Sequence, residues 1–131
     1  MTGLASAPGR DWLDVVSRTT LSDFSEAFSA EPELGASVLS TSILGAARIH
    51  AFFSATRAMY DRIAFTSETP VGDRSVLEWE GTYRGASVQG VTVLERDAGG
   101  AIARIRIFHL PYDQIVAFAD DLSERLQITR L

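Results

Sequence analysis

A histidine close to the end of an alternating segment, residues 101–110, is the residue best suited to do chemistry in this sequence. Ile105, Ile107 and His109 fall on one side of this segment, and charged or aromatic residues fall on the other. A histidine on the apolar side of a strand can serve as a general acid or base, or can donate a hydrogen bond to a carbonyl group. It can equally be a structural residue at the strand end. His109 is therefore our candidate for a catalytic and ligand-binding residue.

A second alternating segment, residues 76–84, carries large aromatic side chains on one side. There Trp79 and Tyr83 flank Gly81, which we expect to leave room for a flat molecule, although the same rings could simply pack as a core. The residues that we expect to bind a ligand are Trp12, Phe53, Leu77, Trp79, Tyr83, Thr92, Ile107 and His109. Tyr83 and Thr92 would supply the polar contacts.

Residue types that the sequence lacks exclude several classes of reaction. It has no cysteine, which removes thiol nucleophiles, disulfides and thiolate metal sites. All 12 basic residues are arginine, so neither a Schiff base on lysine nor a phosphate-binding loop with its lysine can form. The net charge of -5 argues against nucleic acid as a partner. The two histidines lack the spacing of a metal site, and we expect neither a metal nor an organic cofactor.

The first part of the chain follows a helical period. Residues 11–30 place apolar side chains on one stripe, and a second helix-start signal predicts a break near residue 21. A stretch with proline and glycine then ends the helix, and residues 36–40 can form a short strand. Another helix is expected over residues 46–61, where His50 on the flank of the apolar stripe is more typical of a structural residue.

Residues 62–110 instead follow a period of two, which is typical of strands with one buried face. Turn signals at residues 70–73, 85 and 97–100 divide this segment into consecutive hairpins. We expect an antiparallel meander that twists and curls, followed by a last helix that Pro111 opens. Helices packed on one side of a curled sheet make an α+β fold shaped like a cone, and the open end of the cone is the expected ligand pocket.

Three motifs, in their order and spacing, resemble those of the nuclear transport factor 2-like (NTF2-like) superfamily, which includes ketosteroid isomerases and SnoaL-like polyketide cyclases. They are a glycine and an apolar helix start at residues 45–53, a hairpin at residues 90–102, and a strand end with its turn at residues 106–111. The resemblance covers about residues 11–127. It implies the cone-shaped NTF2-like or cystatin-like fold, with a homodimer formed through the outer face of the sheet.

The sequence also departs from the ketosteroid isomerases that it resembles. The position that matches the acid of their oxyanion hole is Thr92, and the position that matches their aspartate base lies near Ser40 or Thr41. Because none of these residues is a carboxylic acid, we do not expect steroid enolisation by the isomerase mechanism.

Three functions remain open from the sequence. The leading one is a SnoaL-like protein that binds a small, largely apolar molecule, such as a polyketide-like or steroid-like one, in the cone. The second is an enzyme of the isomerase, cyclase or lyase type in which His109 transfers a proton. The third is a non-catalytic dimeric interaction module whose cone is filled by its own side chains.

The sequence predicts a flexible tail at residues 1–10 and a single NTF2-like domain over residues 11–131. We see neither a signal peptide nor an apolar run of about 18 residues that could span a membrane. We therefore expect a cytoplasmic protein whose partners are a small-molecule ligand and a second copy of itself, with no nucleic acid and no membrane.

Overall fold

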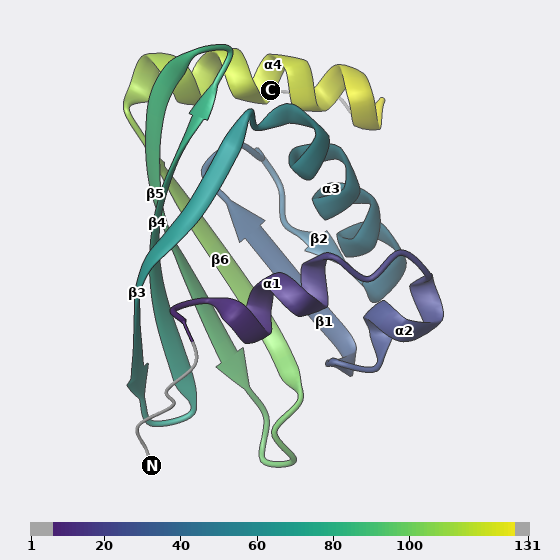
Figure 1. Cartoon of the computed structure of the whole chain (residues 1–131). Coiled ribbons are helices and arrows are strands. Elements are labelled where there is room, and N and C mark those ends of the chain that lie inside the picture. Colours follow the sequence, from purple (N-terminus) through teal and green to yellow (C-terminus); the bar gives the residue numbers. More distant parts are fainter. Residues whose placement is uncertain (1–6, 128–131) are drawn as a thin grey trace.

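A computed structural model describes residues 7–127 as four helices and a six-stranded sheet (Figure 1). The helices are α1 (Arg10–Val16), α2 (Leu21–Ser25), α3 (Ala46–Met59) and α4 (Tyr112–Leu126). The strands are β1 (Phe28–Ala36), β2 (Ile43–Leu44), β3 (Arg62–Val71), β4 (Arg74–Tyr83), β5 (Ala86–Arg96) and β6 (Ile102–Leu110). The predicted α+β class is confirmed.

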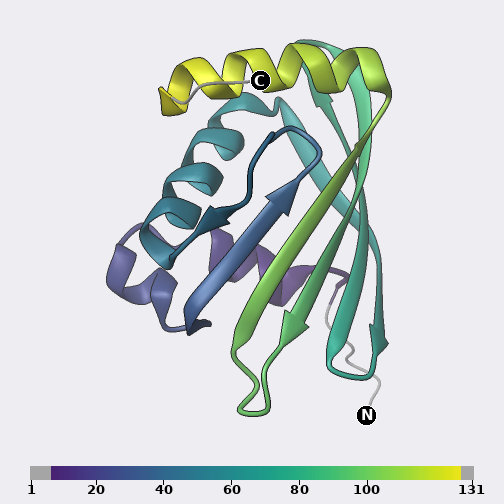
Figure 2. The same cartoon turned by 180° about the vertical axis from the view of Figure 1, so that it is seen from behind.

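The sheet is curved, and the helices cover its inner face (Figures 1 and 2). α1, α2 and α3 lie over the sheet, while α4 crosses the end at which β6 finishes. The core lies between these layers, where Phe24, Ile49, Leu77 and Ile105 are fully buried. Burial of such side chains is the main favourable contribution to folding.

The four strands from β3 to β6 form the antiparallel meander that the period of two predicted. Side chains alternate between the buried and the exposed face along β4 and β6. Ile105, Ile107 and His109 are buried on the inner face, whereas Phe108 is 51% exposed on the outer face.

The prediction for residues 26–40 was wrong, because a strand replaces the end of the expected helix. α2 ends at Ser25, β1 covers Phe28–Ala36, and residues 37–40 form a turn instead of a strand. β1 pairs in parallel with β6 and antiparallel with β2, which makes the whole sheet mixed and gives the order β2-β1-β6-β5-β4-β3. Pro32, which the sequence suggested as a helix stop, lies where the register of β1 is irregular and its missing N–H costs little.

The predicted break near residue 21 is confirmed. α1 ends at Val16 and α2 begins at Leu21, where Thr20 caps the new helix because its hydroxyl accepts a hydrogen bond of 3.2 Å from the N–H of Asp23. α3 ends at Met59, two residues earlier than predicted, and the backbone of Tyr60 is extended.

The predicted N-terminal tail falls partly outside the described residues, which begin at residue 7. Within the described part, the N–H of Gly9 donates a hydrogen bond of 2.9 Å to Glu68 on β3, and α1 starts at Arg10. The end of the predicted domain, residues 128–131, also lies outside. No helix within residues 7–127 is long and apolar enough to cross a membrane.

Candidate functional site

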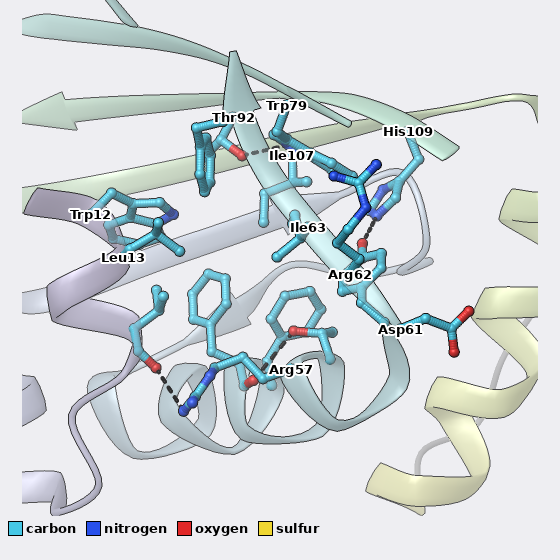
Figure 3. A pocket seen from close by; sticks show the side chains of 16 residues that line it. Trp12, Leu13, Arg57, Asp61, Arg62, Ile63, Trp79, Thr92, Ile107 and His109 are labelled. Carbon is cyan, nitrogen blue, oxygen red and sulfur yellow. Dashed lines mark hydrogen bonds between the residues drawn. The ribbon is translucent and has the colours of Figure 1, made fainter. Parts of the chain in front are cut away.

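A cavity of about 260 Å³ opens between the helical layer and the inner face of the sheet (Figure 3). α1, α3, the turn after α3 and the four strands from β3 to β6 all contribute to its wall. The side chains that line it belong to Trp12, Leu13, Val16, Phe52, Phe53, Thr56, Arg57, Tyr60, Asp61, Arg62, Ile63, Phe65, Trp79, Thr92, Ile107 and His109. The wall is therefore mostly apolar and aromatic, with a small number of polar groups, as in typical small-molecule sites.

A short hydrogen bond joins two polar groups in the wall of this cavity. Tyr60 Oη and His109 Nε2 are 2.6 Å apart, and their rings are nearly parallel. On the other side of the imidazole, Nδ1 lies 3.3 Å from Ser37 Oγ, which also accepts a 3.0 Å hydrogen bond from the N–H of His109. Both ring nitrogens of His109 therefore have a hydroxyl partner.

Aromatic rings pack against this pair. Trp79 meets the imidazole edge-on with the ring centres 5.1 Å apart, and Phe118 of α4 lies 5.4 Å from it. Burial lowers the pKa of His109 to about 4 and raises the pKa of Tyr60 above its ordinary value. Both groups are thus uncharged at neutral pH, which makes them hydrogen-bonding groups that suit a neutral ligand.

Trp79 holds its place in the wall through two contacts. Its indole N–H donates a hydrogen bond of 3.1 Å to Thr92 Oγ1 on the neighbouring strand. Its ring lies over Gly90, where a Cβ atom would overlap the indole. Since the hydroxyl hydrogen of Thr92 is not used by this bond, Thr92 keeps a donor for the cavity.

Three exposed charged side chains also line the cavity: Arg57, Asp61 and Arg62. Arg57 donates a long hydrogen bond of 3.4 Å to the carbonyl of Val16, while Asp61 accepts one of 2.9 Å from the N–H of Gly85. Figure 3 shows Trp12 on the α1 side and His109 at the opposite end of the cavity. The cavity thus combines exposed charged groups with the neutral Tyr60–His109 pair.

Six of the eight residues that we expected to bind a ligand line this cavity: Trp12, Phe53, Trp79, Thr92, Ile107 and His109. Leu77 and Tyr83 lie on the inner face of β4 but do not reach the cavity. Leu77 is fully buried in the core. Tyr83 lies under α4, where its hydroxyl donates a 3.0 Å hydrogen bond to Asp121 and its ring packs on Phe118. The alternation of side chains along β4 predicted the correct face of the sheet, but α4 covers one end of that face.

The space that we expected at Gly81 does not exist. A Cβ atom at this position would overlap the carbonyl oxygen of Arg62, so the absent side chain makes room for the backbone of β3 and not for a ligand. Gly90 is the glycine that accommodates a flat ring, and that ring is Trp79 of the protein itself. His50 lies outside the cavity, where its Nε2 is 3.1 Å from the carbonyl of Arg18 and its ring packs on Phe24.

Tyr60 is the functional candidate that the sequence did not reveal. It directly follows α3, and its hydroxyl meets a histidine that lies 49 residues further along the chain. The cavity residues of β3 and the charged groups that line the cavity were not singled out either. Within residues 7–127, no three His, Asp or Glu side chains gather as a metal site would require.

Comparison with known proteins identifies the fold. No protein-family model matches the chain, and no curated protein matches it in sequence. Among solved structures, an uncharacterised protein with a cystatin-like fold from Silicibacter pomeroyi is 16% identical, with a TM-score of 0.79 over 87% of this chain and 81% of that chain. A steroid delta-isomerase from Pseudomonas aeruginosa is also 16% identical, with a TM-score of 0.79 over 89% of this chain and 87% of that chain.

An NTF2-like protein of unknown function from Burkholderia xenovorans is more distant. It is 13% identical, with a TM-score of 0.58 over 72% of this chain and 77% of that chain. At such identities the likeness is one of fold. The chain has the cone-shaped α+β fold of the NTF2-like, ketosteroid isomerase-like and cystatin-like proteins, and this fold supports many different functions.

Proposed function

We propose that this protein binds a small, largely apolar molecule in the cavity, with one oxygen of the ligand held at the Tyr60–His109 pair. The observation that carries the proposal is an open, aromatic cavity whose wall contains a pair of neutral hydrogen-bonding groups. An open cavity favours a binding protein over an interaction module whose cone is filled by its own side chains. The shared fold with a steroid delta-isomerase supports a ring-containing ligand.

The size of the cavity narrows the class of ligand. Its volume of about 260 Å³ is slightly below the usual range of about 300–1,000 Å³ for small-molecule pockets. This volume suits one or two fused rings better than a larger framework. Edge-to-face rings in the wall, such as Trp12 and Phe53 with centres 5.3 Å apart, offer favourable contacts to an aromatic or unsaturated ring.

An enzyme of the isomerase, cyclase or lyase type is the second candidate function, and the short Tyr60–His109 contact favours it. The low pKa of His109 makes this residue a weak base at neutral pH, because general bases act best when their pKa lies near the working pH. A neutral imidazole can still polarise a carbonyl group or pass on a proton by changing its tautomer. Proton transfer through the pair is therefore the form that an activity here would take.

We also propose that the outer face of the sheet forms a homodimer. Phe108 and Leu110 are 51% and 60% exposed on this face of β6, and Val91 lies opposite Phe108 on β5. Arg104 and Arg106, which alternate with the inner-face residues of β6, both reach Glu95 of their own chain. The proposed interface would therefore rest on the apolar residues.

Calorimetric titration of a panel of ketones, phenols and their ethers with one to three rings tests the binding proposal. Leu13→Trp, at the opening, should weaken every true cavity ligand at least tenfold because the larger side chain occupies the space. Leu44→Trp, an exposed position outside the cavity, serves as the matched control and should change nothing. The proposal would be contradicted if no compound of the panel bound, or if Leu13→Trp left the affinities unchanged.

A further inference from the structure

We propose that Ser37, His109 and Tyr60 form a proton relay that connects solvent with the cavity, and that Tyr60 is the residue that exchanges a proton with the bound molecule. The ligand class that fits is a ring compound with a weakly acidic hydroxyl group, a phenol or an enol. This ligand assignment rests on the proposed binding function, whereas the relay itself can be tested without a ligand.

The outer end of the relay lies at the surface. Ser37 is exposed, and it lines a second hollow of about 220 Å³ between the turn after β1 and the start of α4. Water can therefore reach its hydroxyl. The inner end is Tyr60, which lines the ligand cavity on the other side of His109. The buried imidazole, 7% exposed, thus separates two compartments and contacts a hydroxyl group in each.

Two arrangements of the hydrogen atoms give every polar group of the relay a hydrogen-bond partner. Ser37 Oγ accepts the N–H of His109, so it has one hydrogen and one lone pair left. In the first arrangement, Ser37 donates to Nδ1, Nε2–H donates to Tyr60, and the hydrogen of Tyr60 points to the ligand. In the second, Tyr60 donates to Nε2, Nδ1–H donates to Ser37, and the hydrogen of Ser37 points to water.

The first arrangement becomes the second when each hydrogen atom moves to the next group along the relay. When a ligand arrives as a phenolate or enolate, Tyr60 gives its proton to the ligand oxygen and takes the proton of Nε2. Nδ1 takes the proton of Ser37, and Ser37 takes one from water. The net result is the transfer of one proton from solvent to the ligand, with His109 neutral before and after. Burial of the pair favours such a path because it never requires a charged imidazole.

The ligand-free protein provides the first test, through the exchange of the His109 ring N–H with water measured by NMR. Ser37→Ala should slow this exchange at least tenfold because it removes the hydroxyl that links Nδ1 to solvent. Ser37→Thr, which keeps a hydroxyl, should restore it, and Ser40→Ala in the same turn is the matched control. Exchange that is unchanged in Ser37→Ala would overturn the relay, whether or not the cavity binds ligands.

The second test assigns the role of Tyr60 with two probes, 4-nitrophenol and its methyl ether 4-nitroanisole. Wild-type protein should bind both and raise the pKa of bound 4-nitrophenol, which absorbance reports directly. Tyr60→Phe should weaken the binding of 4-nitrophenol at least tenfold and abolish the change in its pKa. The binding of 4-nitroanisole should stay the same. Equal binding of 4-nitrophenol to both proteins would overturn the assignment of Tyr60. Failure of both probes to bind the wild type would instead count against the proposed binding function and its ligand class.

Discussion

The indole of Trp79 lies over Gly90, its direct partner on the neighbouring strand, and fills the space that a side chain at Gly90 would need. Gly90 is also the partner of His109 on the next strand. Trp79 can therefore reach across the glycine and meet the imidazole edge-on at 5.1 Å. One glycine thus allows two strands that do not touch each other to bring their functional side chains together.

Gly90→Ala should displace the indole from this position, because the added methyl group would overlap it. We expect a loss of about 1–3 kcal/mol in the free energy of unfolding, as is usual when a packed core is overfilled. Denaturant unfolding followed by tryptophan fluorescence measures the loss. Gly35→Ala is a suitable control, since a Cβ atom there meets only Ser42 Oγ at 3.6 Å. Equal stability of the two variants would show that Trp79 is free to move aside.

The buried imidazole should make folding stability depend on pH. The pKa of His109 is about 4 in the folded protein and ordinarily 6.5, so between these values the unfolded chain binds a proton that the folded chain does not. Stability should therefore fall as the pH drops from about 6.5 to 4, by about 2–3 kcal/mol at pH 4.5. His109→Gln should remove this part of the pH dependence. Urea unfolding at several pH values gives the free energy of unfolding of both proteins. If this free energy depended on pH in the same way for both, the expectation would be contradicted.

Local patterns were sufficient to predict most of the sheet and its buried face. The alternation from residue 62 to residue 110 indicated four strands, because a period of two reflects burial on one side regardless of the rest of the fold. It also placed Trp79 and His109 on the inner face, where the structure has them.

What could not be predicted depends on partners distant in the sequence. β1 contains Pro32 and two acidic neighbours, a composition that disfavours a strand, and it becomes one because β6 and β2 supply its hydrogen bonds. Tyr83 and Thr92 share one face of the sheet, and only the course of α4 determines that Tyr83 is covered while Thr92 faces the cavity.

α4 should depend on one carboxylate for its attachment to β4. Burial raises the pKa of Asp121, but hydrogen bonds from Arg125 and Tyr83 and the charges of Arg125 and Arg84 outweigh this, so the pKa is lowered. A lowered pKa contributes stability above the ordinary pKa, and this contribution is lost as the pH falls through the lowered value. Asp121→Asn should therefore cost about 1–2 kcal/mol at pH 7 and less in acid.

Thermal unfolding at pH 7 and at pH 3 measures this difference. Glu124→Gln, an exposed position on the same helix, is the control and should leave the midpoint unchanged. A cost of Asp121→Asn that is the same at both pH values would mean that the charge of the carboxylate is not what holds α4.

The proposed dimer predicts that Phe108→Arg converts the protein to a monomer, because the substitution would place a charge in an apolar interface. Sedimentation velocity at micromolar concentration reports the change. Leu21→Arg, on the helical layer, is the control and should not alter the association state. Wild-type protein that sediments as a monomer would rule out the interface.

The parallel pairing of β1 with β6 has a consequence for synthesis of the chain. Residues 28–36 leave the ribosome well before residues 102–110 exist, so β1 must wait for the strand that completes it. During this interval the apolar side chains of Phe28 and Leu34 lack their neighbours on β6, while the hairpins from β3 to β5 can already form locally. The mixed sheet is therefore completed only when the last strand of the chain joins the first.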